Sequence, residues 1–271
     1  MEIRKIVSFE DGDKHLIDYL QKHNIPFDGE YGILEIYESN PHWNYVEKYA
    51  RQKDLSVLSE TIFSKEELQK AEWLTVRSTW HYEYPQPEND NRYLEITYKN
   101  GCRKCGCGLN QSDAFRMKKP PKWGKRHFLM MNWVGDELFV DEIAKSFLQK
   151  EFPYLSFREV KNKSGNEAYS SVFQLVISTL PSEGIIEQQR HIRQVLVCPD
   201  CGRKKYHPNG VGMLQMHRSV FENAPDIVKT AEWFGWGCGA DREIIINKKM
   251  YRFLLVHHLE KCLSFSPIEL V

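Results

Sequence analysis

The sequence predicts an α+β protein with two zinc-ribbon-like knuckles, separated by a long insertion and flanked by strand–helix–strand units. Two observations carry this prediction. The first is a pair of CxxCG motifs, at 102–106 and 198–202, each of which follows an apolar run typical of a β-strand. The second is a faint repeat, in which a strand-like run, a helical pattern and an apolar tail occur at both 137–160 and 242–270.

The chain of 271 residues is longer than one compact core usually needs. The turn-rich segment PQPEND, at 85–90, marks the first expected boundary. We therefore expect three parts: an N-terminal α+β subdomain at 1–84, a zinc-ribbon region at 85–215 with an inserted strand–helix–strand unit at 137–160, and a C-terminal strand–helix–strand unit at 216–271 that packs on the ribbon.

The N-terminal part shows helical spacing of apolar residues in three places and strand-like alternation in one. Asn40 is the expected cap of the second helix, with Pro41 at its first position. Ser64 and Glu67 have the spacing of a capping box at the start of the third helix. The predicted elements are helices at 13–24, 40–51 and 63–74 and a strand at 31–37.

The repeat consists of two segments with a similar pattern. A strand-like run ends at Val140 in the first segment and at Ile246 in the second, and a helical pattern follows each. Leu-Ser-Phe then precedes an apolar tail in both, and tryptophan lies upstream of each (Trp133; Trp233 with Trp236). We expect the two units to pair around the ribbon, with chance similarity between two amphipathic helices as the alternative.

An acidic cluster precedes the first helix of this repeat. Carboxylates at a helix start complement the positive end of the helix dipole, and we favour this interpretation over a magnesium site. The cluster consists of Asp136, Glu137, Asp141 and Glu142. The sequence contains no HExxH, GxSxG, P-loop or dinucleotide-binding motif. We therefore lean towards a protein that is not an enzyme.

The two CxxCG motifs are predicted to bind one structural Zn²⁺ ion. A CxxC turn brings two thiolates to one point, and the glycine that follows adopts the left-handed conformation that the turn requires. Four thiolates at about 2.3 Å complete a tetrahedral shell, which leaves no coordination position for a catalytic water. The predicted ligands are Cys102, Cys105, Cys198 and Cys201.

The spacing of the motifs leaves alternatives open. Common zinc ribbons have about 15–20 residues between their knuckles, whereas 92 residues lie between Cys105 and Cys198, so we expect a long insertion. Two unrelated reduced pairs, or a redox CxxC, are the alternatives. Cys107 and His207 lie near enough in sequence to replace a predicted ligand.

Basic residues are concentrated at 116–126 and beside both knuckles. They could form a nucleic-acid surface together with an aromatic residue, or they could offset the negative charge of a Zn²⁺ ion with four thiolates. Because 37 Lys and Arg balance 37 Asp and Glu, we favour the second interpretation. The candidate nucleic-acid or anion contacts are Arg116, Lys118, Lys119, Lys122, Trp123, Lys125, Arg126, Lys204 and Lys205.

The start of the chain, MEIRKIVSFEDGDKH, has no apolar core typical of a signal peptide. No run of about 18 apolar residues predicts a membrane span. We therefore expect a cytoplasmic protein, in which cysteines more often bind metal than form disulfides.

The stretches CRKCGCGLNQ, VLVCPDCGRKKY, DIVKTAEWFG and YRFLLVHHLEKCLSFSPIEL resemble a group of bacterial proteins with paired CxxCG motifs. Most members of that group are uncharacterised, and some are classed with immunity proteins of polymorphic toxin systems. The resemblance covers roughly residues 60–271 and implies a non-enzymatic, zinc-stabilised protein that binds a protein partner, such as a toxin. A nucleic-acid-binding zinc-ribbon protein is the alternative.

Overall fold

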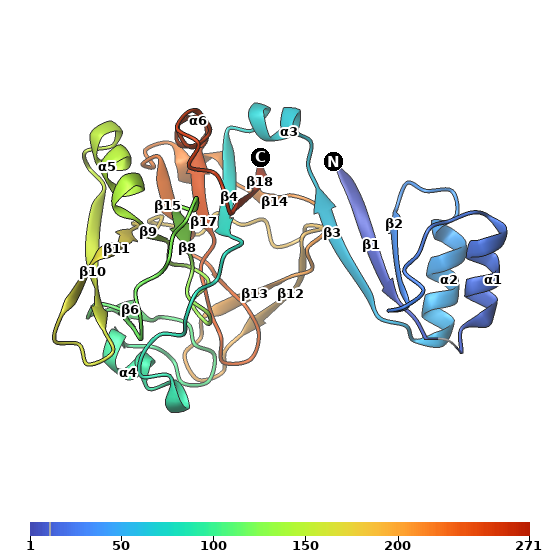
Figure 1. Cartoon of the computed structure of the whole chain (residues 1–271), viewed down its shortest axis with the longest axis horizontal. Coiled ribbons are helices and arrows are strands. Elements are labelled where there is room, and N and C mark those ends of the chain that lie inside the picture. Colours follow the sequence, from blue (N-terminus) through green and yellow to red (C-terminus); the bar gives the residue numbers. More distant parts are fainter. Residues whose placement is uncertain (11) are drawn as a thin grey trace.

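The computed structural model describes residues 1–10 and 12–271 of a mixed α+β protein (Figure 1). Its N-terminal part is an antiparallel sheet in the order β2-β1-β3, against which two helices pack. Their buried apolar side chains, from Val7 to Ala50, form a core of their own. The elements are β1 (Glu2–Ser8), α1 (Lys14–Lys22), β2 (Ile33–Tyr37), α2 (Trp43–Lys53) and β3 (Val57–Ile62).

The predicted helix at 13–24 and strand at 31–37 are confirmed as α1 and β2. The predicted start of the second helix is wrong. Asn40 accepts a hydrogen bond through its side chain from the N–H of His42, which folds a turn before the helix, so α2 begins only at Trp43.

The capping box of the third helix is confirmed, because Ser64 and Glu67 each accept from the other's backbone N–H. This helix, α3 (Lys65–Lys70), is shorter than predicted, and strand β4 (Trp73–Ser78) follows it. A strand buried on both faces is a continuous apolar run, which the pattern does not distinguish from the end of a helix. β4 pairs with β17 and β18, so it lies in a sheet with the C-terminal part of the chain, whereas the predicted division places it in 1–84.

Two five-stranded sheets form most of the remaining structure. The first has the order β7-β10-β11-β9-β8 and lies within the predicted insertion, and the second has the order β14-β18-β4-β17-β15. The strands of the first sheet are β7 (Arg116–Met117), β8 (Phe128–Leu129), β9 (Phe139–Val140), β10 (Ser156–Asn162) and β11 (Ala168–Val176). The strands that join β4 in the second are β14 (Leu214–Met216), β15 (Ile227–Lys229), β17 (Ile244–Asn247) and β18 (Leu263–Leu270).

Both predicted strand–helix–strand units are present. Helix α5 (Glu142–Glu151) connects β9 to β10, and α6 (Lys248–Val256) connects β17 to β18. Asp141 caps α5 by accepting from the N–H of Ala144, as the acidic cluster predicted, and Asn247 caps α6 in the same way. In each unit an antiparallel strand lies between the two connected strands, β11 in the first and β4 in the second.

The two sheets repeat each other in pairing and register. Arg116 pairs in parallel with Lys161 at the edge of the first sheet, as Leu214 pairs with Ile268 in the second. The first repeat consists of β4 and β7 to β10, and the second consists of β11, β14, β15, β17 and β18. Each sheet therefore takes its middle strand from the other repeat, and the two repeats interlock.

Each CxxCG motif lies at the tip of a short hairpin that belongs to one repeat. Tyr98 pairs with Gln111 in the first hairpin, and Gln194 pairs with His207 in the second, so the two hairpins have the same register relative to their cysteines. The first hairpin is β5 (Tyr98–Lys99) with β6 (Asn110–Gln111), which follows η1 (Asn89–Asn91) and α4 (Tyr93–Thr97). The second is β12 (Ile192–Val197) with β13 (Lys204–Pro208), and its neighbours are β16 (Trp233–Phe234) and η2 (Arg218–Phe221).

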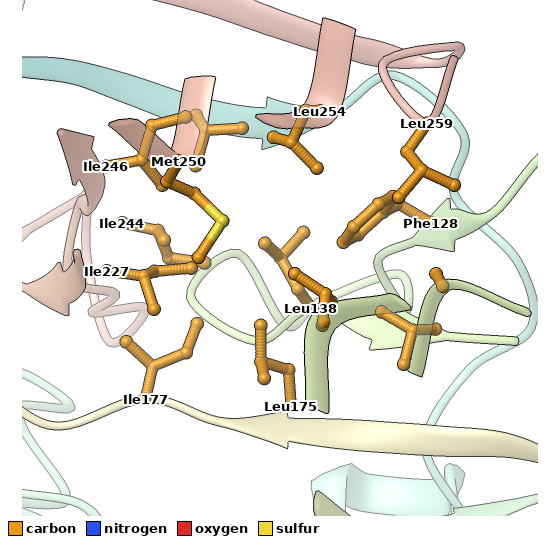
Figure 2. Packing of buried hydrophobic residues seen from close by; sticks show 14 of the residues in the cluster. Phe128, Leu138, Leu175, Ile177, Ile227, Ile244, Ile246, Met250, Leu254 and Leu259 are labelled. Atoms are coloured by element: carbon orange, nitrogen blue, oxygen red, sulfur yellow. The ribbon is translucent and has the colours of Figure 1, made fainter. Parts of the chain in front are cut away.

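The two repeats share one hydrophobic core, shown in Figure 2. Leu175 of β11 and Ile177, just after this strand, face Ile227, Ile244 and other apolar residues of the second sheet. Met250 and Leu254 of α6 and Leu148 of α5 close the same core from the helix side. Because both helices pack on one core, the repeats form one structural unit rather than two separate domains.

None of the helices in the described chain, which leaves out only residue 11, has the length and apolar character needed to cross a bilayer.

Candidate metal centre

The four predicted cysteines lie together, and their Sγ atoms are all within 4.8 Å of one another. The Sγ atoms of Cys102 and Cys198 are 3.8 Å apart, and those of Cys105 and Cys201 are 3.6 Å apart. A tetrahedron with Zn–S bonds of about 2.3 Å has edges of about 3.8 Å. The donor set therefore fits a tetrahedral thiophilic ion with respect to both ligand type and distance.

Both knuckles have the same backbone hydrogen bonds. The N–H of Gly106 donates to the carbonyl of Cys102, and the N–H of Gly202 donates to the carbonyl of Cys198, both at 2.8 Å. Each first cysteine also donates its N–H to the carbonyl five residues later. The two glycines have φ of +77° and +71°, the left-handed conformation that the sequence predicted.

Backbone N–H groups point at the sulfurs and favour the thiolate form. The N–H of Arg203, assisted by its side chain, lowers the pKa of Cys201 to about 6. The N–H groups of Cys105 and Lys104 lower the pKa of Cys102. Burial raises the pKa of Cys105, whose thiolate has the most to gain from a bound cation. The site is thus prepared for negative charge on at least two sulfurs.

Cys107 and His207 are not part of the four-sulfur cluster. Cys107 is fully buried, and its Sγ lies 3.9 Å from the carbonyl oxygen of Cys105. His207 packs edge-on against Trp236, with ring centroids 3.9 Å apart. Cys107 therefore packs against the knuckle cysteines, and His207 packs against Trp236.

Lys205 was a candidate nucleic-acid or anion contact, and the structure contradicts that role. The side chain is buried, and its ammonium group donates to the carbonyls of Cys105, Gly237 and Gly239 at 2.6–3.1 Å. All three N–H bonds of the ammonium group are therefore satisfied. Lys205 ties the first knuckle to the loop at 235–240 and places a positive charge beside the sulfurs.

Five of the other predicted contacts have partners within the protein. Arg116, Lys118 and Lys204 make ion pairs with Asp113, Glu88 and Glu187. The guanidinium of Arg126 stacks on Trp80, and Trp123 donates its indole N–H to the carbonyl of Ser171. The exposed side chains that remain are Lys119, Lys122 and Lys125.

A cavity of about 690 Å³ lies beside the metal centre, and no sequence motif predicted it. Its wall includes Cys102 and Gly106 of the first knuckle, residues of α4 and β5, and the loops at 133–137 and 235–242. Both loops lead to the strand that precedes the helix: the first connects β8 to β9, and the second connects β16 to β17. The cavity therefore lies at the interface between the two repeats, and ligand-binding sites are common at such interfaces.

Charged side chains lie at the bottom of this cavity. The ammonium of Lys229 contacts the carboxylate of Glu137 at 2.5 Å and lies 3.7 Å from that of Asp136. Gln174 also donates to Glu137 at 2.9 Å. Burial, and then the charge of Asp136, raise the pKa of Asp241 to about 6. The acidic cluster of the sequence thus separates into Asp141 at the helix start and Asp136 with Glu137 in the cavity.

Comparisons with protein-family models, with curated proteins and with solved structures give no match to this chain.

Proposed function

We propose that the protein is a non-enzymatic binding protein whose interlocked repeats are held together by one structural Zn²⁺ ion. The observation that carries the proposal is the convergence of two hairpins of identical register, each contributing two cysteines to one cluster. Cys102, Cys105, Cys198 and Cys201 would hold the ion, which would cross-link the two repeats. Four thiolates fill the shell of Zn²⁺, so the ion supports the fold and offers no position for substrate.

Metal analysis of the natively purified protein tests this proposal. We expect one zinc per chain, and substitution with Co²⁺ should give the thiolate-to-cobalt charge-transfer and ligand-field bands of a tetrahedral sulfur site. Cys198→Ser should lose the metal, whereas Cys238→Ser, an exposed cysteine beside the site, should retain it. A protein that is folded and free of metal, or one that contains iron, would contradict the assignment to zinc.

The finer prediction is that the bound partner is a protein, such as a bacterial toxin, in the cytoplasm. It rests on the resemblance of the paired CxxCG motifs to proteins classed with toxin immunity. A toxin gene is then expected beside this one, and its product should form a stoichiometric complex with the chain. If the product of the adjacent gene neither binds nor is inhibited at micromolar concentration, the immunity prediction fails.

Nucleic-acid binding is the weaker alternative, because most of the basic side chains already have partners. Only three of the predicted lysines, Lys119, Lys122 and Lys125, are exposed on the loop and have no carboxylate partner within the described chain. Phosphate contacts would give an affinity that falls steeply with salt. Two results together would favour this alternative. The protein would bind DNA or RNA measurably, and independently of sequence, at about 50 mM salt. The variant with alanine at all three lysines would lose this binding.

A further inference from the structure

We propose that the cavity between the repeats is a binding site for a small organic cation, a ligand with an amidinium, guanidinium or ammonium group on an aromatic or apolar body. This inference goes beyond the proposed zinc-stabilised scaffold, because it concerns a ligand site with its own side chains. Its volume of about 690 Å³ is in the range of small-molecule pockets.

A weakly paired carboxylate is the first observation. Asp136 lines the cavity, is 9% exposed and accepts no hydrogen bond from any residue in 1–10 or 12–271. Its ion pair with Lys229 is long, at 3.7 Å, because the ammonium group of Lys229 lies closer to Glu137. Asp241 lines the same cavity, and within the described residues one of its oxygens accepts a hydrogen bond, from the N–H of Gly135. A ligand that brings N–H donors and positive charge would complete the partners of these two carboxylates.

The internal repeat supplies the second observation. Trp133 follows β8 and Trp233 follows β15, the matching strands of the two repeats, and both tryptophans line the cavity. The guanidinium of Arg242 lies 4.1 Å from the ring of Trp233, so the protein itself places a cation on this indole. Trp133 is 54% exposed, and no Lys or Arg of the described chain lies over its ring. A ligand cation would occupy at Trp133 the place that Arg242 occupies at Trp233.

The backbone of Trp133 is the third observation. Its φ is +65°, a left-handed conformation that is rare for a bulky residue and that recurs at ligand-binding sites. Tyr93 stacks on Trp133 with ring centroids 6.3 Å apart and, like it, lines the cavity. Gly135 then approaches Asp241 so closely that a Cβ atom would lie 2.7 Å from its Oδ2 atom. The loop at 133–137 is thus held so that an aromatic wall and a carboxylate face one space.

Two arginines in the cavity wall favour an anion, which is the competing class of ligand. Arg158 and Arg242 also line the cavity, and each has one buried N–H group without a partner in the described part of the chain. These groups would favour an anion. We infer the cation because the exposed indole ring of Trp133 attracts a cation rather than an anion, and because Arg242 is already held against Trp233 and Thr179.

Three isosteric compounds test the charge of the ligand directly: benzamidine is cationic, benzamide is neutral and benzoate is anionic. We expect benzamidine to bind the zinc-loaded protein and to shift the indole NMR signal of Trp133, with benzamide and benzoate at least about tenfold weaker. Equal affinity for all three, preference for benzoate, or no binding of benzamidine at millimolar concentration would overturn the proposal. Zinc content measured on the same samples separates this result from a failure of the metal centre.

Variants locate the site. Asp136→Asn keeps the shape and removes the charge, and it should weaken benzamidine about 10- to 100-fold, the usual effect of losing a hydrogen bond to a charged group. Asp90→Asn, at an exposed carboxylate on the rim of the same cavity, is the matched control and should bind normally. Trp133→Gly should also weaken binding while relieving the left-handed backbone. Full affinity in both Asp136→Asn and Trp133→Gly would place the cation elsewhere and overturn the site.

Discussion

Replacement of one knuckle cysteine should destabilise the interlocked repeats far more than an ordinary cysteine substitution. In Cys198→Ser the hydroxyl is a poor ligand, and the remaining three thiolates hold the ion less tightly. The ion connects cysteines 96 residues apart, and a cross-link that closes a loop of about 100 residues removes chain entropy worth about 4.7 kcal/mol. For a protein of 150–250 residues, 1 kcal/mol corresponds to about 2–4 °C in melting temperature. We therefore expect the melting temperature to fall by about 10–20 °C.

Differential scanning calorimetry with parallel metal analysis measures this effect. Cys238→Ser serves as the control, because Cys238 is exposed and lies outside the cluster. Chelation of the wild-type protein should give the same shift as Cys198→Ser, and the chelator should have no further effect on that variant. A variant that melts within about 2 °C of the wild type, below the shift for 1 kcal/mol, would refute the idea that the metal cross-links the repeats.

Three further predictions follow from single contacts. Gly202→Ala should cost about 1–2 kcal/mol for its left-handed backbone alone, because no atom lies within 4 Å of the added Cβ. Gly106→Ala should cost clearly more, because its Cβ would lie 2.2 Å from the carbonyl oxygen of Cys238. Urea denaturation compares the two variants. The pKa of Asp241 is raised to about 6 from an ordinary value of 3.8, so its ionisation costs stability as pH rises through this window, and Asp241→Asn should stabilise the protein by about 3 kcal/mol near pH 8 but hardly near pH 4. The N-terminal part has its own core, so hydrogen exchange should show residues 1–62 keeping their protection when chelator opens the repeats; joint loss would refute this independence.

Local signals in the sequence predicted the elements that depend on neighbouring residues. The capping box at Ser64, the left-handed glycines of the knuckles and the alternation of β2 each arise from chemistry within a few residues. β4 was missed because its apolar run becomes a strand only through pairing with β17 and β18, far along the chain. Asn40 was misassigned because an Asn-Pro pair favours a turn as readily as a helix cap.

The metal centre could be predicted because its four ligands belong to one residue type at a fixed spacing. The cavity could not, because its walls come from α4, from two loops and from β11 and β15, which meet only in the folded protein. The sequence did contain one useful signal, the tryptophan before each strand–helix–strand unit. The error at Lys205 has the same origin, since formal charge does not show whether an amine faces solvent or three carbonyls.

The two repeats have different residue types at one position beside the cavity. Met130 forms a parallel bridge with His81 in the first repeat, and Lys229 forms the matching bridge with Thr179 in the second. Met130 is buried among apolar residues, whereas Lys229 reaches Glu137. Divergence at this position therefore placed a buried ion pair at one side of the interface.

A double-mutant cycle tests whether this pair supports the cavity. Lys229→Leu supplies an apolar side chain, as Met130 does in the first repeat, but leaves Glu137 buried without its cation, which should cost about 3–5 kcal/mol. Adding Glu137→Gln removes the unpaired charge and keeps an acceptor for Gln174, so most of the lost stability should return. Chemical denaturation of the four proteins gives the coupling energy. If the double variant were as unstable as Lys229→Leu alone, the cost would come from the lysine stem rather than from the charge, and the cavity would not depend on this pair.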